Sequence, residues 1–251
     1  MKKTLFCFLV FCVLTQSECY ASGSRDWDGV DDQINCGSGA SLDQLTSFTA
    51  AAWFKADSLG ESSIGFIISK RTGSGAAAGW KLGVTDSGTE KLNVLCDFTG
   101  GGSVDGDWDT PADSIILGQW HHAALVYDRS ATTNDPVIYI DGVSQSITEV
   151  TTPVGSAVDD SAQSFIIGNN AVGSTTFDGS IGYVLYIGRL FSGWEVTQAM
   201  WYPLSIPSAL SQPIWGDTAE QDLSGNGNDG TVTGTTTVAL GGPIVIGGLP
   251  L

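Results

Sequence analysis

The segment Gly118–Asp128, with the sequence GQWHHAALVYD, decides the fold. Its pattern is typical of a β-strand, on which successive side chains point to opposite faces. We expect one face of this strand to carry four side chains, those of Trp120, His122, Ala124 and Val126. The two histidine rings then point to opposite faces and cannot chelate one metal ion. Because the chain has no other histidine, we predict a structural role for both and no zinc site.

The sequence on either side of this segment alternates short apolar or β-branched runs with clusters of Gly, Asp, Asn and Ser, which predicts many short strands. The pair Asp141-Gly142 favours a two-residue hairpin turn, because both positions tolerate positive φ, and so predicts antiparallel neighbours. One segment is helical in pattern: Ser192 can cap it, and Glu195 completes a capping box. The clearest strand-like runs are residues 48–55, 64–70, 80–84, 91–98, 120–128, 137–140, 165–168 and 181–190.

The composition is also typical of a turn-rich β protein. Of the 251 residues 33 are glycine, 15% are charged and 42% are hydrophobic, so Ser, Thr, Asn and Gln must supply much of the polar surface. A β-sandwich of this length commonly folds as one unit around one core. We therefore expect a single main domain of the all-β class.

The chain is strongly acidic, with a formal net charge of −17. Such a charge repels phosphate backbones and anionic membrane surfaces, which makes nucleic acid a poor partner. The carboxylates are available to bind hard cations through oxygen. The alternative is a solvated acidic surface without a specific partner.

The N-terminus has the pattern of a secretory signal peptide. Lys2 and Lys3 precede an apolar run at residues 4–14, and a polar stretch leads to Ala21, where we expect cleavage. A bilayer-spanning helix needs about 20 apolar residues, so this run of about 11 is too short to be one. No later stretch is long and apolar enough either. We therefore expect a secreted or surface-associated protein.

Two cysteines, Cys36 and Cys96, follow the predicted leader. In an oxidising compartment they can form one disulfide. The alternative, weighed equally, is that both are small buried groups within strands.

Several blocks of the sequence occur in a distinctive order: residues 27–34, 48–55, 118–128, 137–142, 165–168, 177–181 and 194–201. In this order they resemble the laminin-G-like, concanavalin A-like jelly-roll family, which includes lectins, pentraxins and adhesive modules. The resemblance covers residues 26–203. It implies an antiparallel two-sheet jelly-roll sandwich with one short closing helix, and a role in recognising glycans or a surface partner.

The resemblance divides the chain into a leader (1–21), a jelly-roll domain (22–203) and a C-terminal extension (204–251). Within the extension, residues 222–232, DLSGNGNDGTV, look like the stretch that often precedes the opening strand in relatives. Either the extension supplies that edge strand in permuted order, which we favour because domain termini often lie close together, or it is the beginning of a second repeat.

Enzyme chemistry has little support in the sequence. Laminarinase-like members of the family carry two glutamates beside an aspartate on one strand, since retaining hydrolysis needs carboxyl groups about 5–5.5 Å apart. After the leader the glutamates are isolated from one another, at Glu61, Glu90, Glu149, Glu195 and Glu220. We predict no catalytic residues, and a glycoside hydrolase is a distant alternative.

Calcium is the cofactor that the sequence favours most. Asp105, Asp107 and Asp109 place carboxylates at alternate positions beside a glycine-rich stretch. The same spacing recurs before Gly227 in a second set, Asp222, Ser224 and Asn226. Neither set has the terminal glutamate of an EF-hand. The alternative for both is an ordinary solvated turn.

Trp108 lies between two of these carboxylates, in what the pattern indicates is a loop. Sugar faces stack on such rings, and neighbouring carboxylates can bind the hydroxyl groups. We therefore predict a glycan site formed by Trp108, Asp107 and Asp109. The alternative is a loop anchored on the sandwich by its tryptophan.

Two functional classes follow. The first is a non-catalytic binding or adhesion module that recognises glycans or a surface protein through rim loops. The second is a structural subunit of an extracellular or particle surface, which self-associates through the apolar segment at residues 241–251.

Overall fold

The computed structural model describes residues 18–21, 23–43, 46–73, 79–86, 89–100, 105–208, 210–212, 219–238 and 244–247. Most of the predicted leader, residues 1–17, lies outside this part of the chain, as do residues 241–243 and 248–251. No helix in the described part has the length and hydropathy that crossing a bilayer requires.

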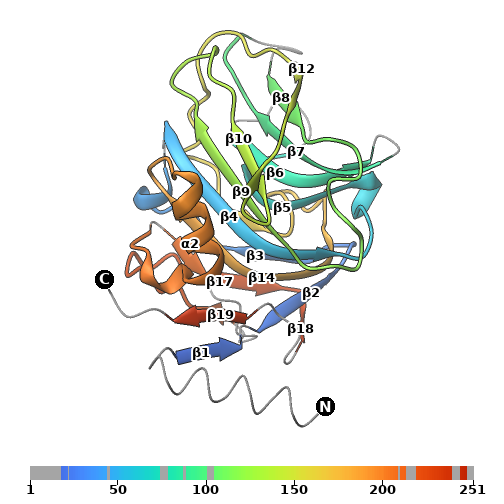
Figure 1. Ribbon diagram of the computed structural model, residues 1–251, viewed down its shortest axis with the longest axis vertical. Helices are drawn as coiled ribbons and strands as arrows, with labels where there is room; N and C mark the ends of the chain where they lie inside the picture. Colours follow the sequence, from blue (N-terminus) through green and yellow to red (C-terminus); the bar gives the residue numbers. More distant parts are fainter. Residues whose placement is uncertain are drawn as a thin grey trace.

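Two antiparallel β-sheets stacked face to face form the body of the molecule (Figure 1). The fold is thus the all-β, two-sheet jelly-roll that the sequence predicts. One sheet has the strand order β11-β10-β9-β4-β14-β2-β18, with β15 paired to the second half of β14. The other has the order β12-β8-β7-β6-β5-β13-β3-β17-β16. A separate two-stranded sheet pairs β1 with β19.

The eight-stranded sheet consists of β11 (Val143–Ser144), β10 (Val137–Ile140), β9 (His121–Asp128), β4 (Ser47–Ala56), β14 (Asp178–Ile187), β2 (Ser24–Asp28), β18 (Thr236–Val238) and β15 (Leu210–Gln212). The nine-stranded sheet consists of β12 (Thr148–Thr151), β8 (Gly106–Asp109), β7 (Glu90–Cys96), β6 (Gly79–Asp86), β5 (Ile64–Arg71), β13 (Ile166–Ile167), β3 (Gln33–Asn35), β17 (Gly230–Thr233) and β16 (Ala219–Glu220). The remaining elements are β1 (Glu18–Ala21), β19 (Ile244–Gly247), the helix α2 (Gly193–Trp201), and the 3-10 turns η1 (Ala40–Leu42), η2 (Glu61–Ser63) and η3 (Pro203–Ser205).

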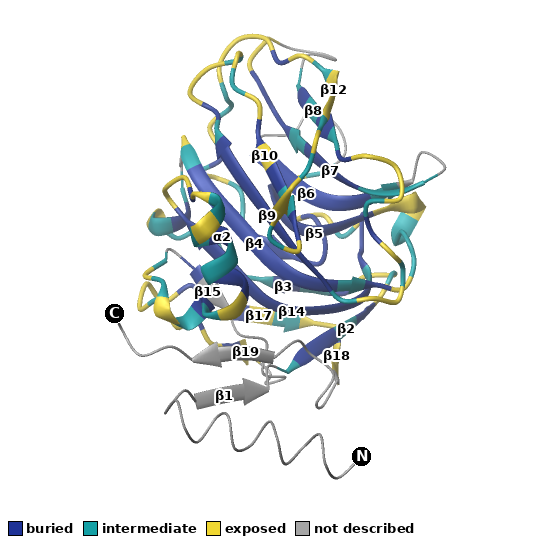
Figure 2. Ribbon diagram, viewed as in Figure 1, coloured by how far each residue is buried: buried dark blue, intermediate teal, exposed yellow. Residues whose placement is uncertain are grey.

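Strand β9, from the segment that decides the fold, lies between β4 and β10 in the eight-stranded sheet. Its residues Ala123, Leu125 and Tyr127 belong to the core between the sheets. Ala124 and Val126 face the other way and pack beneath α2. The expected alternation of side chains is confirmed. Because β9 has the core on one face and α2 on the other, it is buried along most of its length (Figure 2).

The two local signals also form as predicted. Asp141 and Gly142 have φ values of 53° and 80° and connect β10 to β11 in an antiparallel hairpin. Ser192 caps α2: its side chain accepts a hydrogen bond from the backbone N–H of Glu195, and the Glu195 carboxylate accepts one from the backbone N–H of Ser192. Helix α2 therefore begins where the sequence indicates and covers the outer face of the eight-stranded sheet (Figure 1).

Residues beyond 204 contribute strands to both sheets. β17 pairs with β3, and β18 pairs with β2, so the two N-terminal strands of the sandwich each have a neighbour from the C-terminal extension. The buried side chain of Arg25 in β2 forms an ion pair with Glu220 in β16, which connects the two sheets at this end.

Candidate functional site

A groove of about 290 Å³ lies on the outer face of the nine-stranded sheet. Its position follows from strand alternation. Trp80 and Leu82 of β6 point into the core, so Lys81 between them points outward. Leu92 and Val94 of β7 do the same for Asn93. We call this feature the outer groove; its lining residues are Ile64, Phe66, Arg71, Lys81, Thr85, Asn93, Leu95, Asp107, Asp109 and Thr175.

The floor of the outer groove is a hydrogen-bonded network centred on Asn93. Its side-chain Nδ2 donates to Oδ1 of Asp107 at 2.6 Å and to Oδ1 of Asp109 at 2.8 Å. Asp109 also accepts a hydrogen bond from Nζ of Lys91 at 2.6 Å. These cross-strand contacts fix both carboxylates in place, because the register of β7 and β8 pairs Asn93 with Asp109 directly.

Lys81 is a buried cation of the outer groove, with 4% of its surface exposed, the same fraction as Arg71. One of its three ammonium donors bonds to Oδ1 of Asn93, and the ammonium lies 5.2 Å from the ring centroid of Phe66. Burial lowers the pKa of Lys81 to about 8. A bound ligand with oxygen acceptors can replace the solvation that the ammonium lacks here.

Thr175 supplies a second polar group to the outer groove. The residue is 5% exposed, and its Oγ1 has no hydrogen-bond partner among the described residues. A buried hydroxyl without a partner costs about 1–3 kcal/mol, so such groups are rare unless a ligand or ordered water completes them. Nearby, Arg71 is held by two hydrogen bonds to the Asp97 carboxylate, each 2.8 Å long. The outer groove therefore offers donors and acceptors on a preformed frame.

The structure corrects the prediction for Trp108. Its side chain is fully buried, packs edge-on against Tyr127 with ring centroids 5.4 Å apart, and donates from Nε1 to Asp135 at 2.9 Å. The indole therefore has no face on which a sugar could stack. The reason is local: residues 106–109 form a strand, so Trp108 points inward while its neighbours Asp107 and Asp109 point outward into the groove.

The first predicted calcium set does not converge. Asp107 and Asp109 bind Asn93, whereas Asp105 accepts a hydrogen bond from the backbone N–H of Phe98 at 3.2 Å. Within the described ranges, one group of three carboxylates lies within 4.8 Å of one another: Asp28, Asp31 and Asp32. The DGVDD motif places these three residues close together in the sequence, but no calcium site was predicted there.

The second predicted calcium set forms a tight turn. The Asp222 carboxylate accepts hydrogen bonds from the backbone N–H of Ser224 at 2.9 Å and of Asn228 at 3.0 Å. The backbone N–H of Asn226 donates in turn to the hydroxyl of Ser224. These hydrogen bonds close the loop on itself, which agrees with the alternative of an ordinary turn. Calcium binding stays a prediction for this loop.

Both cysteines are free and buried. Of the two alternatives weighed equally, the structure therefore has the small buried core groups and not the disulfide. Cys36 and Cys96 both belong to the core cluster between the sheets. Burial raises the pKa of the Cys96 thiol to about 12, so this group stays protonated at neutral pH.

The two histidine rings are buried and lie on opposite faces of β9, as the alternation predicts. His121 Nδ1 lies 2.8 Å from Oδ2 of Asp141, and its Nε2 accepts a hydrogen bond from the backbone N–H of Ile116. His122 lies on the opposite face, next to the ring of Trp53 with centroids 5.4 Å apart. Burial lowers the pKa of His122 to about 4.

This burial predicts an acid-sensitive contribution to stability. The unfolded chain protonates His122 near its ordinary pKa of 6.5, whereas the folded chain holds it neutral until the pH approaches 4. The contribution of neutral His122 to the free energy of unfolding is complete above pH 6.5. It is lost as the pH falls toward 4, a decrease of about 3 kcal/mol. Urea unfolding at pH 7 and pH 4 measures it, with His122→Phe as the comparison. Equal losses in both proteins would contradict the prediction.

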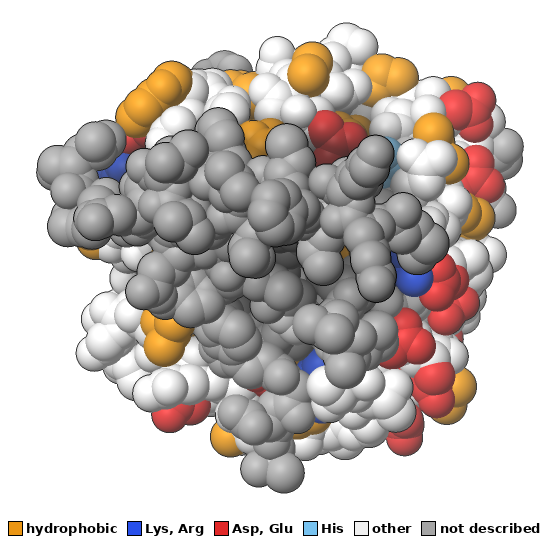
Figure 3. Space-filling model, turned by 60° about the horizontal axis from the view of Figure 1, so that its bottom comes forward, with side chains coloured by type: hydrophobic (Ala, Val, Ile, Leu, Met, Phe, Trp, Pro, Cys, Tyr) orange, Lys and Arg blue, Asp and Glu red, His pale blue; other side chains and the backbone are white. Residues whose placement is uncertain are grey.

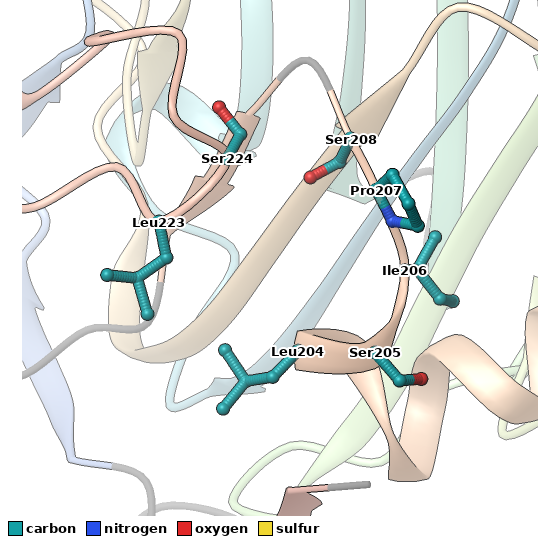
Figure 4. Close-up of a pocket in the computed structure, with 7 residues that line it drawn as sticks. All are labelled: Leu204, Ser205, Ile206, Pro207, Ser208, Leu223 and Ser224. Carbon is teal, nitrogen blue, oxygen red and sulfur yellow. The ribbon is translucent and has the colours of Figure 1, made fainter. Parts of the chain in front are cut away.

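A second hollow, of about 390 Å³, lies between η3 and the loop before β17 (Figure 4). Residues 204–208 form one side of it, and Leu223 and Ser224 form the other. The lining carries no charged or titratable side chain, so it supplies no acid, base or ion pair for a ligand. The outer groove is therefore the better candidate site.

Comparison with known proteins agrees with this architecture. The model of the concanavalin A-like lectin/glucanases superfamily matches residues 28–197. The chain belongs to this superfamily. The match extends from the end of β2 into α2 and includes every strand that lines the outer groove.

Solved structures share the concanavalin A-like fold at low sequence identity. One is a candidate carbohydrate-binding protein from Bacteroides ovatus, with a TM-score of 0.62 and 20% identity over 89% of this chain. This chain spans 61% of that protein's length. Another is a heptameric SAP-like pentraxin from Limulus polyphemus, with a TM-score of 0.50 and 13% identity over 90% of this chain and 95% of that one. A search of curated protein sequences finds no significant match.

Sequence reasoning missed Lys81, Asn93 and Thr175. A signal was present for the first two: each is a single polar residue inside an apolar run, Trp80-Lys81-Leu82 and Leu92-Asn93-Val94. A strand with one face on the core must place such a residue on the other face. The sequence could not show that the two lie on neighbouring strands. Thr175 lies in the segment between β13 and β14, and no periodic pattern marks it.

Proposed function

We propose that this protein is an exported, non-catalytic glycan-binding module whose binding site is the outer groove. The observation that carries the proposal is that the outer groove is lined both by Thr175, whose hydroxyl has no partner among the described residues, and by Lys81, whose ammonium uses one of its three donors. Each sugar hydroxyl donates one hydrogen bond and accepts others, so it needs both kinds of partner within a small space. The protein of similar fold from Bacteroides ovatus is itself a candidate carbohydrate-binding protein, which supports this class of ligand.

The charge balance of the outer groove favours a neutral sugar. The lining side chains include two cations, Arg71 and Lys81, and two anions, Asp107 and Asp109. Arg71 is paired with Asp97 and Asp109 with Lys91, so these two charges are already compensated. Lys81 and Asp107 remain as one cation and one anion on the same floor. A ligand with a net charge would approach one of them against repulsion from the other.

The carboxylates of the outer groove are poorly suited to hydrolysis. A glycosidase needs one protonated carboxyl group as acid and a second carboxylate as nucleophile or base. Both Asp107 and Asp109 accept hydrogen bonds from Asn93, and Asp109 also accepts one from Lys91. Both carboxylates are therefore held by contacts within the sheet, and this supports binding without catalysis.

Replacing Lys81 with methionine tests the proposal. Methionine keeps most of the apolar stem but removes the donors, so we expect affinity for the recognised glycan to fall at least about tenfold. A glycan array on the unmodified protein identifies the ligand, and calorimetry compares the variant.

The matched control is Glu149→Gln, an exposed position on β12 of the same sheet that does not line the groove. Unchanged affinity in Lys81→Met, or an array without any bound glycan, would refute the proposal. We also propose calcium as a cofactor, and the same glycan array tests it. Glycan binding that is equal in the presence of calcium and of a chelator would reject a role for calcium in recognition.

A further inference from the structure

Strand β19 stands apart from the two main sheets. Within the described part of the chain its one strand partner is β1, and four residue pairs join them, from Glu18 opposite Gly247 to Ala21 opposite Ile244. β19 also lies against α2 and η3 (Figure 1). Its position is therefore supported by the sandwich and does not depend on β1 alone.

All four residues of β1 fall within the predicted leader, residues 1–21. Cleavage after Ala21 removes the whole strand and leaves the backbone N–H and C=O groups along one edge of β19 without a partner. An edge strand of this kind is a template for pairing with another chain. Residues 244–247, IVIG, contain no charge and no proline to oppose such pairing.

We propose that leader removal opens the edge of β19 and that β19 of a second copy takes the place of β1. The inference rests on the proposed export of the chain and is independent of glycan binding. A second copy is the simplest occupant: two identical strands paired antiparallel around a twofold axis satisfy each other's backbone groups with one shared surface.

Helix α2, which lies against β19, supports an apolar contact. Two of its side chains, Trp194 and Trp201, are 64% and 41% exposed, although tryptophan is usually well buried in a monomer. Large aromatic side chains are enriched at the buried centres of protein interfaces. Acidic side chains gather toward one rim of the same end of the molecule (Figure 3). Since the chain carries a net charge of −17, two copies repel each other, and association is expected to strengthen as salt screens that charge.

Sedimentation velocity on the exported protein tests the pairing, with intact mass establishing where the leader ends. We expect a species of twice the monomer mass that grows with concentration and with salt. Ile246→Pro removes a backbone donor from the strand and should weaken association at least about tenfold, whereas Ile246→Val keeps the backbone and should associate as the parent does. Circular dichroism confirms that each variant keeps the β fold.

Single cysteines then identify the occupant. In Ile244→Cys, Val245→Cys or Ile246→Cys, the position nearest the twofold axis faces its own copy and should form a disulfide-linked dimer under mild oxidation. The control is Val143→Cys, on the exposed edge strand β11. Cys36 and Cys96 are buried and do not compete. The proposal would be overturned if the exported protein stays monomeric or retains its leader. It would also be overturned if the dimer survives Ile246→Pro or if no cysteine in β19 links the two copies.

Discussion

The Trp108→Ala variant is expected to lose about 3–5 kcal/mol of unfolding free energy, the range found when a buried aromatic side chain is truncated. The indole is fully buried, contacts the ring of Tyr127 and donates a hydrogen bond to Asp135. Gly106 shows how closely the ring is packed: a Cβ at that position would lie 2.0 Å from the indole. Truncation therefore leaves a cavity between the sheets and removes the hydrogen bond to Asp135.

Urea unfolding followed by circular dichroism measures this loss. Val30→Ala is the control, because Val30 is 62% exposed and its truncation should change stability by less than about 0.5 kcal/mol. The result also separates the two interpretations of Trp108. A variant that keeps its stability but no longer binds glycan would restore the indole as a binding surface, contrary to its position in the structure.

Replacing Asp160 with alanine should have an effect of similar size, about 3–5 kcal/mol, because it removes the anion that compensates two buried cations. Asp160 Oδ2 accepts a hydrogen bond from Nη2 of Arg129 at 2.7 Å, and its Oδ1 lies 3.6 Å from Nζ of Lys70. The side chains of Lys70 and Asp160 are fully buried. Lys70 retains Asp43 in the variant, but Arg129 loses a carboxylate in a region that water does not reach.

Thermal and urea unfolding of Asp160→Ala are compared with those of Asp57→Ala. The Asp57 side chain is 47% exposed and lies 3.7 Å from the partly exposed Lys55, so its loss should cost at most about 1 kcal/mol. The loss in Asp160→Ala should also persist at high salt, because a buried pair is screened much less than an exposed one. Similar losses in the two variants would show that water reaches the Asp160 network.

The parts of the fold that depend on local pattern were predictable. Residues 118–128 alternate between two apolar environments, and Ser192 with Glu195 carries a complete capping box, so strand and helix follow from neighbouring residues. Trp108 was misassigned for the same kind of reason. The glycine-rich stretch before it favoured a loop, whereas the alternation of Asp107, Trp108 and Asp109 is itself a strand with its tryptophan inward.

The outer groove was less accessible to sequence reasoning, because it depends on strand register. Lys81 meets Asn93 across β6 and β7, and Asn93 meets the two aspartates across β7 and β8. These contacts join residues that are 12 to 16 positions apart in the chain, and a one-residue slip would send each side chain to the other face. Turn lengths and cross-strand packing set that register, and neither is readable from one sequence.

The outer groove and α2 occupy the outer faces of different sheets: the groove lies on the nine-stranded sheet, and α2 covers the eight-stranded sheet (Figure 1). A ligand in the outer groove therefore does not compete for space with anything seated beside the helix. In a paired molecule, two weak sugar sites would be carried on one body, and binding at the first would raise the effective concentration of the second. Attachment to a repetitive polysaccharide would then be governed by avidity, so a modest single-site affinity would suffice for firm retention on a glycan-coated surface.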